Sequence, residues 1–211
     1  SGNPWTRVLL QAATGIYTGS IYLDPYLRKS GLLGENHVEA REVIAVETHQ
    51  QCWAAGSHGS ALVVVRHPLH AVLAEASRQS SDGRHSAEVP YEELRKFFTK
   101  NRAIMMTGWS KHVKSWMECP VGKNLIVRFE DIVKDTYGVY VRDILPFFDI
   151  DTSNKAVLQR LRSAIDYSNS NRGTRRSHSY KFQFTDEDRS DAQRVAGDVM
   201  EKNGYGPIYT A

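Results

Sequence analysis

The feature that most constrains the fold is a run of five apolar residues, Ala61–Val65 (ALVVV). Arg66 follows this run directly, and Pro68 comes two residues later. A short, uninterrupted, β-branched run is typical of a strand buried on both faces, as in a parallel sheet covered by helices. Proline fits the first position of a helix, so we expect a helix from Pro68 to about Arg78. The sequence therefore predicts a strand–helix unit in the middle of the chain.

Further strand and helix patterns alternate on either side of this unit. The other predicted strands are Glu42–Thr48 and Asn124–Phe129. The other predicted helices are Pro4–Ala13, Glu92–Glu118 (broken or kinked near Gly108), Tyr137–Phe147, Thr152–Ile165 and Asp186–Asn203, the last ended by Gly204. The predicted loops are Gly15–Gly34, with room for one short helix, Ser80–Ser86, and the basic stretch Tyr167–Ser179. This alternation predicts an α/β fold with a parallel sheet flanked by helices on both faces.

Length and composition fit one folded domain over residues 1–211. The chain shows no internal repeat and no linker, and 41% of its residues are hydrophobic. Its net charge of +3 is too small to predict nucleic-acid binding, but it suits an anionic ligand such as a nucleotide. No apolar run approaches the ~20 residues of a membrane span. A basic-then-apolar leader is also absent, although an anchor could lie upstream.

Two cysteines, Cys52 and Cys119, leave two alternatives open. They could form a disulfide in a secretory compartment, or they could be two buried free thiols. Neither belongs to a CxxC pair, which argues against a zinc cluster or a thioredoxin-type site. Since no metal-ligand spacing is visible elsewhere, we expect no metal.

The chain begins SGNPWT, a small-residue turn that opens directly into the predicted first helix. Free backbone N–H groups and the positive end of the helix dipole favour an anion at such a place. An ordinary helix N-cap is the alternative. A second candidate phosphate ligand is Arg66, which ends the buried strand at the sheet edge where α/β proteins bind ligands. Its planar guanidinium suits a phosphate, although Arg66 could also be a surface residue.

These motifs, together with the stretch TGIYTGS at residues 14–20, resemble the PAPS-dependent sulfotransferase family. The closest resemblance is to the WSC-domain-containing, carbohydrate-type branch of that family. SGNPW resembles the family's 5′-phosphosulfate loop, and the Gly-Lys-Ser/Thr of a kinase loop is absent. The resemblance implies a P-loop-like α/β fold of the sulfotransferase type, with a first strand before Ser1. It also implies PAPS as donor, PAP as product and no metal.

The resemblance also implies a set of donor-binding residues. The 5′ loop would consist of Ser1, Gly2, Asn3, Trp5 and Thr6, with Trp5 stacking on adenine. Arg66 would bind the 3′-phosphate. Phe129, in the segment VRFED, would either pack against adenine or belong to the core. One of the arginines in the basic loop, Arg172, Arg175 or Arg176, would clamp the 3′-phosphate unless the loop is simply solvated.

The candidate catalytic base is His49, which follows the predicted strand ending in VET. An acceptor hydroxyl needs a base to remove its proton, and histidine titrates near neutrality. The family often has lysine where this chain has Glu47. If both side chains point into the site, Glu47 could orient His49, or it could place an unfavourable negative charge near the donor. Arg78 we interpret as an ion-pair partner of Glu75.

Three departures from the family pattern, at Pro4, Glu47 and Ala74, keep alternatives open. The chain could be a PAPS- or PAP-binding pseudoenzyme without transfer activity, or a P-loop nucleotide kinase. If it is a sulfotransferase, the branch resemblance implies a sugar or glycoconjugate hydroxyl, free or on a small molecule, as acceptor. It also implies a location in the Golgi lumen. The oligomeric state is not predicted.

Overall fold

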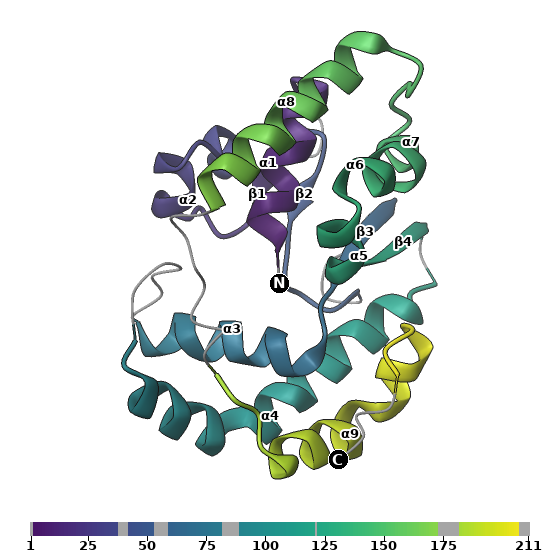
Figure 1. Cartoon of the computed structure of the whole chain (residues 1–211). Coiled ribbons are helices and arrows are strands. Elements are labelled where there is room, and N and C mark those ends of the chain that lie inside the picture. Colours follow the sequence, from purple (N-terminus) through teal and green to yellow (C-terminus); the bar gives the residue numbers. More distant parts are fainter. Residues whose placement is uncertain are drawn as a thin grey trace.

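The computed structural model describes residues 2–37, 42–52, 59–81, 89–120, 122–172 and 182–206, with the backbone alone at 171 and 172 (Figure 1). Ser1, Arg175 and Arg176 of the predicted site therefore lie outside the described residues, as does the side chain of Arg172. Within the described parts of the chain, no helix combines the length and the apolar character that crossing a membrane requires.

Five long helices dominate the architecture. They are α1 (Asn3–Thr14), α3 (Pro68–Ser80), α4 (Tyr91–Met117), α8 (Lys155–Arg172) and α9 (Asp186–Lys202). Shorter helices are α2 (Pro25–Lys29), η1 (Leu33–Asn36), α5 (Phe129–Lys134), α6 (Thr136–Val139), the single π-helical turn η3 (Tyr140–Ile144) and α7 (Leu145–Phe147). Local sequence explains several of their boundaries: proline lies in the first turn of α1, α2 and α3, where no hydrogen bond is lost.

The described strands pair in parallel, which confirms the α/β class. β3 (Ser60–Val65) pairs with β4 (Lys123–Arg128), and the register brings Val65 opposite Arg128. β1 (Gly19–Ser20) pairs with β2 (Val46–Glu47). These strands form two separate two-stranded sheets and not one continuous sheet. In Figure 1 the helices lie on both sides of the strands, with α1 and α8 on one side and α3, α4 and α9 on the other.

Three element predictions were wrong in extent. The strand predicted at Glu42–Thr48 is paired only at Val46–Glu47, because its partner β1 is itself two residues long. α4 passes through Gly108 without a break, since it packs along both α3 and α9. α8 continues to Arg172, through part of the predicted basic loop, and is tied there to α1 by a hydrogen bond from the indole of Trp5 to Ser168.

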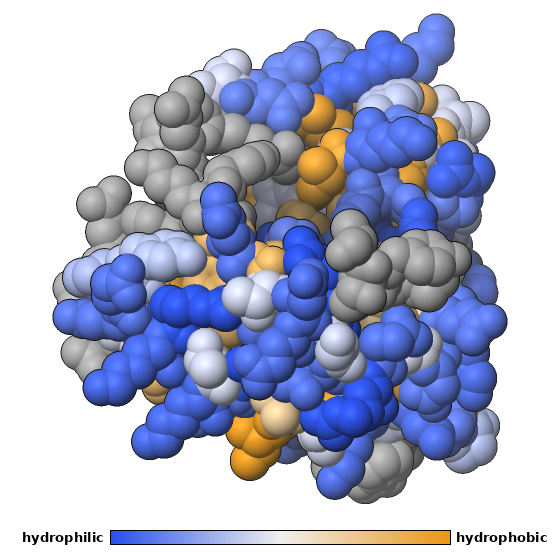
Figure 2. All heavy atoms as spheres, turned by 60° about the horizontal axis from the view of Figure 1, so that its bottom comes forward, coloured by the Kyte–Doolittle hydropathy of each residue, from blue (hydrophilic) through white to orange (hydrophobic). Residues whose placement is uncertain are grey.

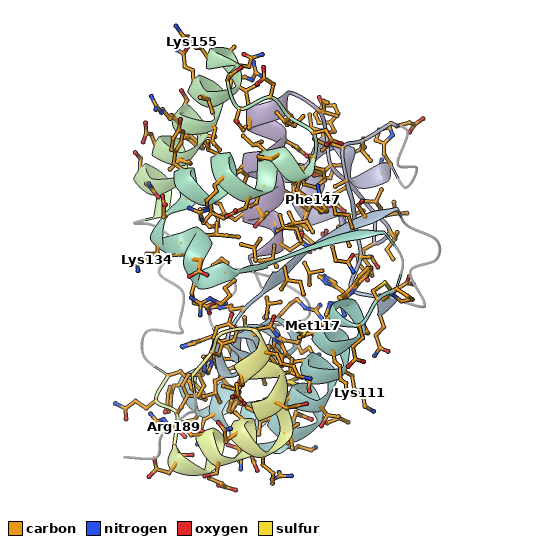
Figure 3. The ribbon with its side chains drawn as sticks, turned by 90° about the vertical axis from the view of Figure 1, so that its right-hand side faces the viewer. Lys111, Met117, Lys134, Phe147, Lys155 and Arg189 are labelled. Atoms are coloured by element: carbon orange, nitrogen blue, oxygen red, sulfur yellow. A yellow bond between two sulfur atoms is a disulfide. The ribbon has the colours of Figure 1, made fainter. Side chains whose placement is uncertain are left out.

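The apolar core has three parts, of which two include residues of β3 and β4. One joins α1 to α8 through Leu9, Leu10, Tyr140 and Leu161. A second packs β3 against the ends of α4 and α9, and the third lies between α3, α4 and α9. Figure 3 shows α9, which carries Arg189, running beside α4, which carries Met117. The outer face of this pair is largely hydrophilic (Figure 2), as expected for a helical layer that buries its other face.

The two cysteines form a disulfide, which decides between the alternatives that the sequence leaves open. Cys52 and Cys119 have Cα atoms 5.9 Å apart and are separated by 67 positions in the chain. The bond joins the segment after β2 to the end of α4. Near the same place the indole N–H of Trp116 donates to the carbonyl of Gln50 at 3.1 Å. The segment that carries His49 is thus anchored to α4.

Candidate functional site

The start of α1 lies against an aromatic ring. Gly2, the N-cap of α1, has φ 90°, a left-handed conformation that favours glycine. A Cβ atom on Gly2 would come within 2.2 Å of Cδ2 of Phe129. The ring of Phe129 therefore fills the space that a side chain at position 2 would need. No side-chain cap and no acidic residue occupy the first turn of α1. The positive end of this helix therefore lies against Phe129, and its own first turn supplies no carboxylate to neutralise it.

Phe129 also brings together the two predicted phosphate-binding motifs. The ring of Trp5 meets it edge-on, with centroids 6.1 Å apart and an interplanar angle of 78°. From the other motif, the guanidinium carbon of Arg66 lies 5.1 Å from the centroid of the same ring. β3 and β4 end side by side, which places Arg66 next to Phe129 at the start of α5. The N-terminal turn and the strand-end arginine thus converge, as the donor hypothesis requires.

The guanidinium of Arg66 has hydrogen-bond donors that no described residue uses. Within the described residues its guanidinium makes no hydrogen bond and no ion pair, and Phe129 is its ring contact. Burial lowers the pKa of Arg66, while the nearby carboxylate of Glu130 raises it. The backbone at Arg66 is fixed because the indole N–H of Trp109 donates to its carbonyl at 3.1 Å. A partly desolvated guanidinium with free donors gains strongly from a phosphate or sulfate.

The sheet edge around Arg66 is closed by residues that sequence reasoning missed. Glu130 accepts hydrogen bonds from the backbone N–H of His67 at 3.0 Å and from the hydroxyl of Tyr205 at 2.7 Å. The Tyr205 hydroxyl also lies 3.1 Å from the carbonyl oxygen of Val65. Burial lowers the pKa of His67 to about 4, so this imidazole is neutral at physiological pH. No sequence signal pointed to Tyr205, because its partners lie 75 or more positions away.

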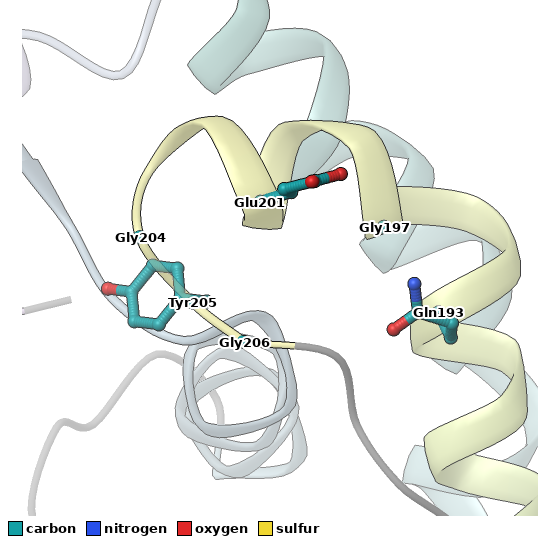
Figure 4. A pocket seen from close by; sticks show the side chains of 6 residues that line it. All are labelled: Gln193, Gly197, Glu201, Gly204, Tyr205 and Gly206. Atoms are coloured by element: carbon teal, nitrogen blue, oxygen red, sulfur yellow. The ribbon is translucent and has the colours of Figure 1, made fainter.

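A shallow hollow of about 340 Å³ lies beyond Tyr205, between the end of α9 and the turn that follows it (Figure 4). Gln193, Gly197 and Glu201 line it from α9, and Gly204 and Gly206 from the turn. Its walls come from α9 and the turn, and not from the two phosphate motifs. We therefore place the candidate site at Phe129 and Arg66.

The remaining residues of the predicted 5′ loop have different environments. The hydroxyl of Thr6 is buried and donates to the carbonyl of Gly2 at 3.1 Å, so it stabilises the helix start. Asn3 has a buried side-chain oxygen without a hydrogen-bond partner in the described structure. The indole of Trp5 donates to Ser168 at 2.9 Å, which orients its ring. Asn3 thus remains a candidate ligand, while Thr6 supports the loop from behind.

His49 is exposed and surrounded by polar groups from several elements. Its side chain is 60% exposed, and its ring stacks on Tyr22 with centroids 5.2 Å apart. Its backbone N–H donates to the Tyr22 hydroxyl oxygen at 2.7 Å. His112 of α4 lies close enough for its pKa to be lowered by burial and then by His49. The exposed imidazole of His49 is accessible to an acceptor, as a base must be.

Glu47 lies beside His49, although β2 ends at Glu47 and His49 is not on the strand face that the sequence predicts for both. Its Oε1 is 3.5 Å from Nε2 of His49, while its Oε2 pairs with the guanidinium of Arg7 in α1. The same Nη1 of Arg7 lies 2.5 Å from Glu35. Burial raises the pKa of Glu47, Arg7 lowers it and Glu35 raises it. This buried group links the first helix, which carries the 5′ loop, to the candidate base.

Glu75 and Arg78 form the ion pair that the sequence suggests. The Nη2 of Arg78 lies 2.5 Å from Glu75, and its Nε donates to the same carboxylate at 2.9 Å. The guanidinium of Arg78 is therefore already paired within α3, and we assign Arg78 a structural role.

Comparison with known proteins gives relatives but no stated activity. The chain is similar to WSCD family members. A protein of that name from Aedes aegypti is 36% identical over 165 residues, which is 74% of this chain and 49% of the relative. One from Drosophila melanogaster is 35% identical over 170 residues, covering 78% of this chain and 51% of the relative. One from Drosophila pseudoobscura pseudoobscura is 36% identical over 158 residues.

The chain thus spans about half the length of the curated relatives that it matches. No family model matches it. The names of the relatives describe no substrate and no reaction.

Proposed function

We propose that this chain binds PAPS where α1, β3 and α5 meet and transfers its sulfuryl group to an acceptor hydroxyl. The observation that carries the proposal is the convergence of Gly2, Trp5 and Arg66 on the ring of Phe129. PAPS has an anionic group on each side of an adenosine. A site for it needs two anion-binding points around apolar, ring-stacking surface, and this junction supplies both.

The residues at each end fit the donor. On the 5′ side, the uncapped start of α1 offers backbone N–H groups and the positive helix dipole, although Pro4 removes one N–H. On the 3′ side, Arg66 offers a guanidinium that has no counter-ion within hydrogen-bonding distance among the described residues. Trp5 and Phe129 offer aromatic faces for adenine. The parallel pairing of β3 and β4 under helices on both faces supports a P-loop-like fold of the sulfotransferase type.

In the proposed reaction, the acceptor oxygen forms a bond to sulfur while the bond from sulfur to the bridging phosphate oxygen breaks. PAP leaves with the electron pair of that bond. His49 takes the proton of the acceptor hydroxyl, which its exposure on Tyr22 permits. The start of α1 stabilises negative charge on the leaving side, and Arg66 fixes the far end of the nucleotide.

The acceptor that we propose is a sugar or glycoconjugate hydroxyl, and the proposed location is the Golgi lumen. Both follow from the resemblance to the carbohydrate-type branch. The Cys52–Cys119 disulfide supports an oxidising compartment, since such bonds persist mainly in secreted and lumenal proteins.

Thermal stabilisation by PAP tests donor binding. We expect a clear rise in melting temperature with PAP for the wild type and a much smaller one for Arg66→Ala. Arg194→Ala is the matched control: Arg194 is exposed on α9 and pairs with Asp191, so PAP should stabilise this variant as it does the wild type. Equal stabilisation of Arg66→Ala and wild type would overturn the proposed site.

Two further measurements separate the alternatives. Turnover of labelled PAPS with a panel of sugar acceptors distinguishes a transferase from a pseudoenzyme, which would bind PAP but release no sulfated product. Stabilisation by ATP that exceeds stabilisation by PAP would instead indicate a nucleotide kinase. The missing Gly-Lys-Ser/Thr argues against that outcome.

A further inference from the structure

The buried group formed by Arg7, Glu35 and Glu47 contains one cation and two carboxylates. All three side chains are at most 7% exposed, and both carboxylates contact the same nitrogen of Arg7. Nε and Nη2 of Arg7 donate to the hydroxyl and the carbonyl of Thr18, at 3.1 and 3.2 Å. Arg7 therefore compensates one negative charge, and one carboxylate is left in excess.

A buried carboxylate without a matching cation is costly, because water no longer solvates it. The raised pKa of Glu47 reflects this cost, since burial and then Glu35 act against its ionised form. The excess charge would be relieved by a second cation next to Glu47. Oε2 of Glu47 pairs with Arg7, and Oε1 lies 3.5 Å from Nε2 of His49.

The other described groups that face His49 do not supply an unpaired negative charge beside it. Glu75 of α3 acts on His49 electrostatically, but its carboxylate is already held by Arg78 and Gln79. His112 of α4 is a second imidazole, which opposes a positive charge on His49. Tyr22 stacks on the ring and brings no charge at neutral pH. Among the described residues, Glu47 is therefore the carboxylate beside His49 whose charge is not compensated.

We propose that Glu47 is a positioning residue that holds His49 and stabilises its protonated form. In the transfer reaction, the proton that leaves the acceptor hydroxyl moves onto His49, and the imidazolium becomes the missing counter-ion of Glu47. Arg7 and Glu35 keep Glu47 in place and connect it to the helix that carries the 5′ loop. The catalytic role of His49 in this inference rests on the proposed function. The electrostatic coupling between Glu47 and His49 is independent of that function.

The structure offers a substitution that leaves the fold balanced. Glu47→Gln leaves Arg7 and Glu35 as a matched pair of one cation and one carboxylate. We therefore expect this variant to fold and to be at least as stable as the wild type. Arg7→Ala would instead leave two buried carboxylates without a cation, so it is unsuitable as a test.

The first measurement is the titration of the His49 ring by NMR, in the free protein. We expect the midpoint to move to lower pH in Glu47→Gln, because a neighbouring carboxylate favours the protonated imidazole. Glu75→Gln is the matched control: it also removes a carboxylate near His49, but one already paired, and its shift should be smaller. Equal midpoints in Glu47→Gln and wild type would overturn the proposal, whatever the protein catalyses.

The second measurement is transfer kinetics with labelled PAPS. Glu47→Gln should lower kcat by roughly 10–100-fold, leave stabilisation by PAP unchanged and move the acid limb of the pH profile to lower pH. An unchanged kcat and pH profile would remove Glu47 from the reaction even if the NMR midpoint shifts. If the wild type transfers nothing, the proposed function fails, and the titration alone decides whether Glu47 stabilises protonated His49.

Discussion

The backbone of Gly2 lies so close to the Phe129 ring that a side chain has no room there: a Cβ on Gly2 would lie 2.2 Å from Cδ2 of Phe129. Gly2→Ala should therefore displace the start of α1 from the ring. We expect unfolding stability to fall by about 1–3 kcal/mol, from the clash and the left-handed backbone together. PAP should bind at least about tenfold more weakly, since a shift of this size misplaces the anion-binding N–H groups. Urea unfolding and PAP titration check both effects.

Gly15→Ala separates the two causes. Gly15 ends the same helix with φ 76°, but a Cβ there would meet nothing within 4 Å. This variant carries the backbone strain without the clash, so it should lose some stability and bind PAP as the wild type does. Equal losses of PAP affinity in both variants would show that contact with Phe129 is irrelevant to the site.

The hydroxyl of Tyr205 should matter for the sheet edge that holds Arg66. Tyr205→Phe removes the hydrogen bond to Glu130, whose other oxygen accepts from the His67 backbone. We expect a loss of about 1–2 kcal/mol in stability and a several-fold loss of PAP affinity, because Glu130 becomes freer to pair with Arg66. Chemical denaturation and PAP titration measure these effects. Tyr26→Phe, on an exposed ring, is the control and should change neither.

The Cys52–Cys119 disulfide should contribute strongly to stability. It closes a loop across 67 positions, for which the chain-entropy treatment gives about 4 kcal/mol. Guanidinium unfolding with and without a reductant should show this difference, and a Cys52→Ser/Cys119→Ser double variant should resemble the reduced protein. A reductant that leaves the unfolding midpoint unchanged would contradict the assigned bond.

Glu47 should make stability depend on pH in a defined direction. Its pKa is raised in the folded protein by burial, so the unfolded chain loses this proton at lower pH than the folded chain does. Stability from this group is therefore present at low pH and is lost as the pH rises above the ordinary value of a glutamate and through the raised one. In Glu47→Gln this decline should disappear. Denaturation across the pH range checks this, and a wild-type-like decline in the variant would contradict it.

Local patterns predicted the elements around the site well. The apolar run before Arg66 is β3, Pro68 begins α3, and the turn at Gly2 opens into α1. These features depend on neighbours within a turn or a strand, where backbone preferences and proline geometry act directly. The predicted break at Gly108 was wrong, because α4 continues through this residue as one helix packed against α3 and α9.

The sequence by itself determined the turn at Gly2 that opens into the first helix, the strand that ends just before Arg66 and the position of His49 after β2. Each of these follows from a few adjacent residues. Tertiary structure alone decided that Phe129 joins the first two, that Glu130 is held by Tyr205, and that Arg7 and Glu35 secure Glu47 beside His49. These partners are tens of residues apart. Their meeting depends on how helices and strands pack, and buried charges have to be balanced in space and not along the chain.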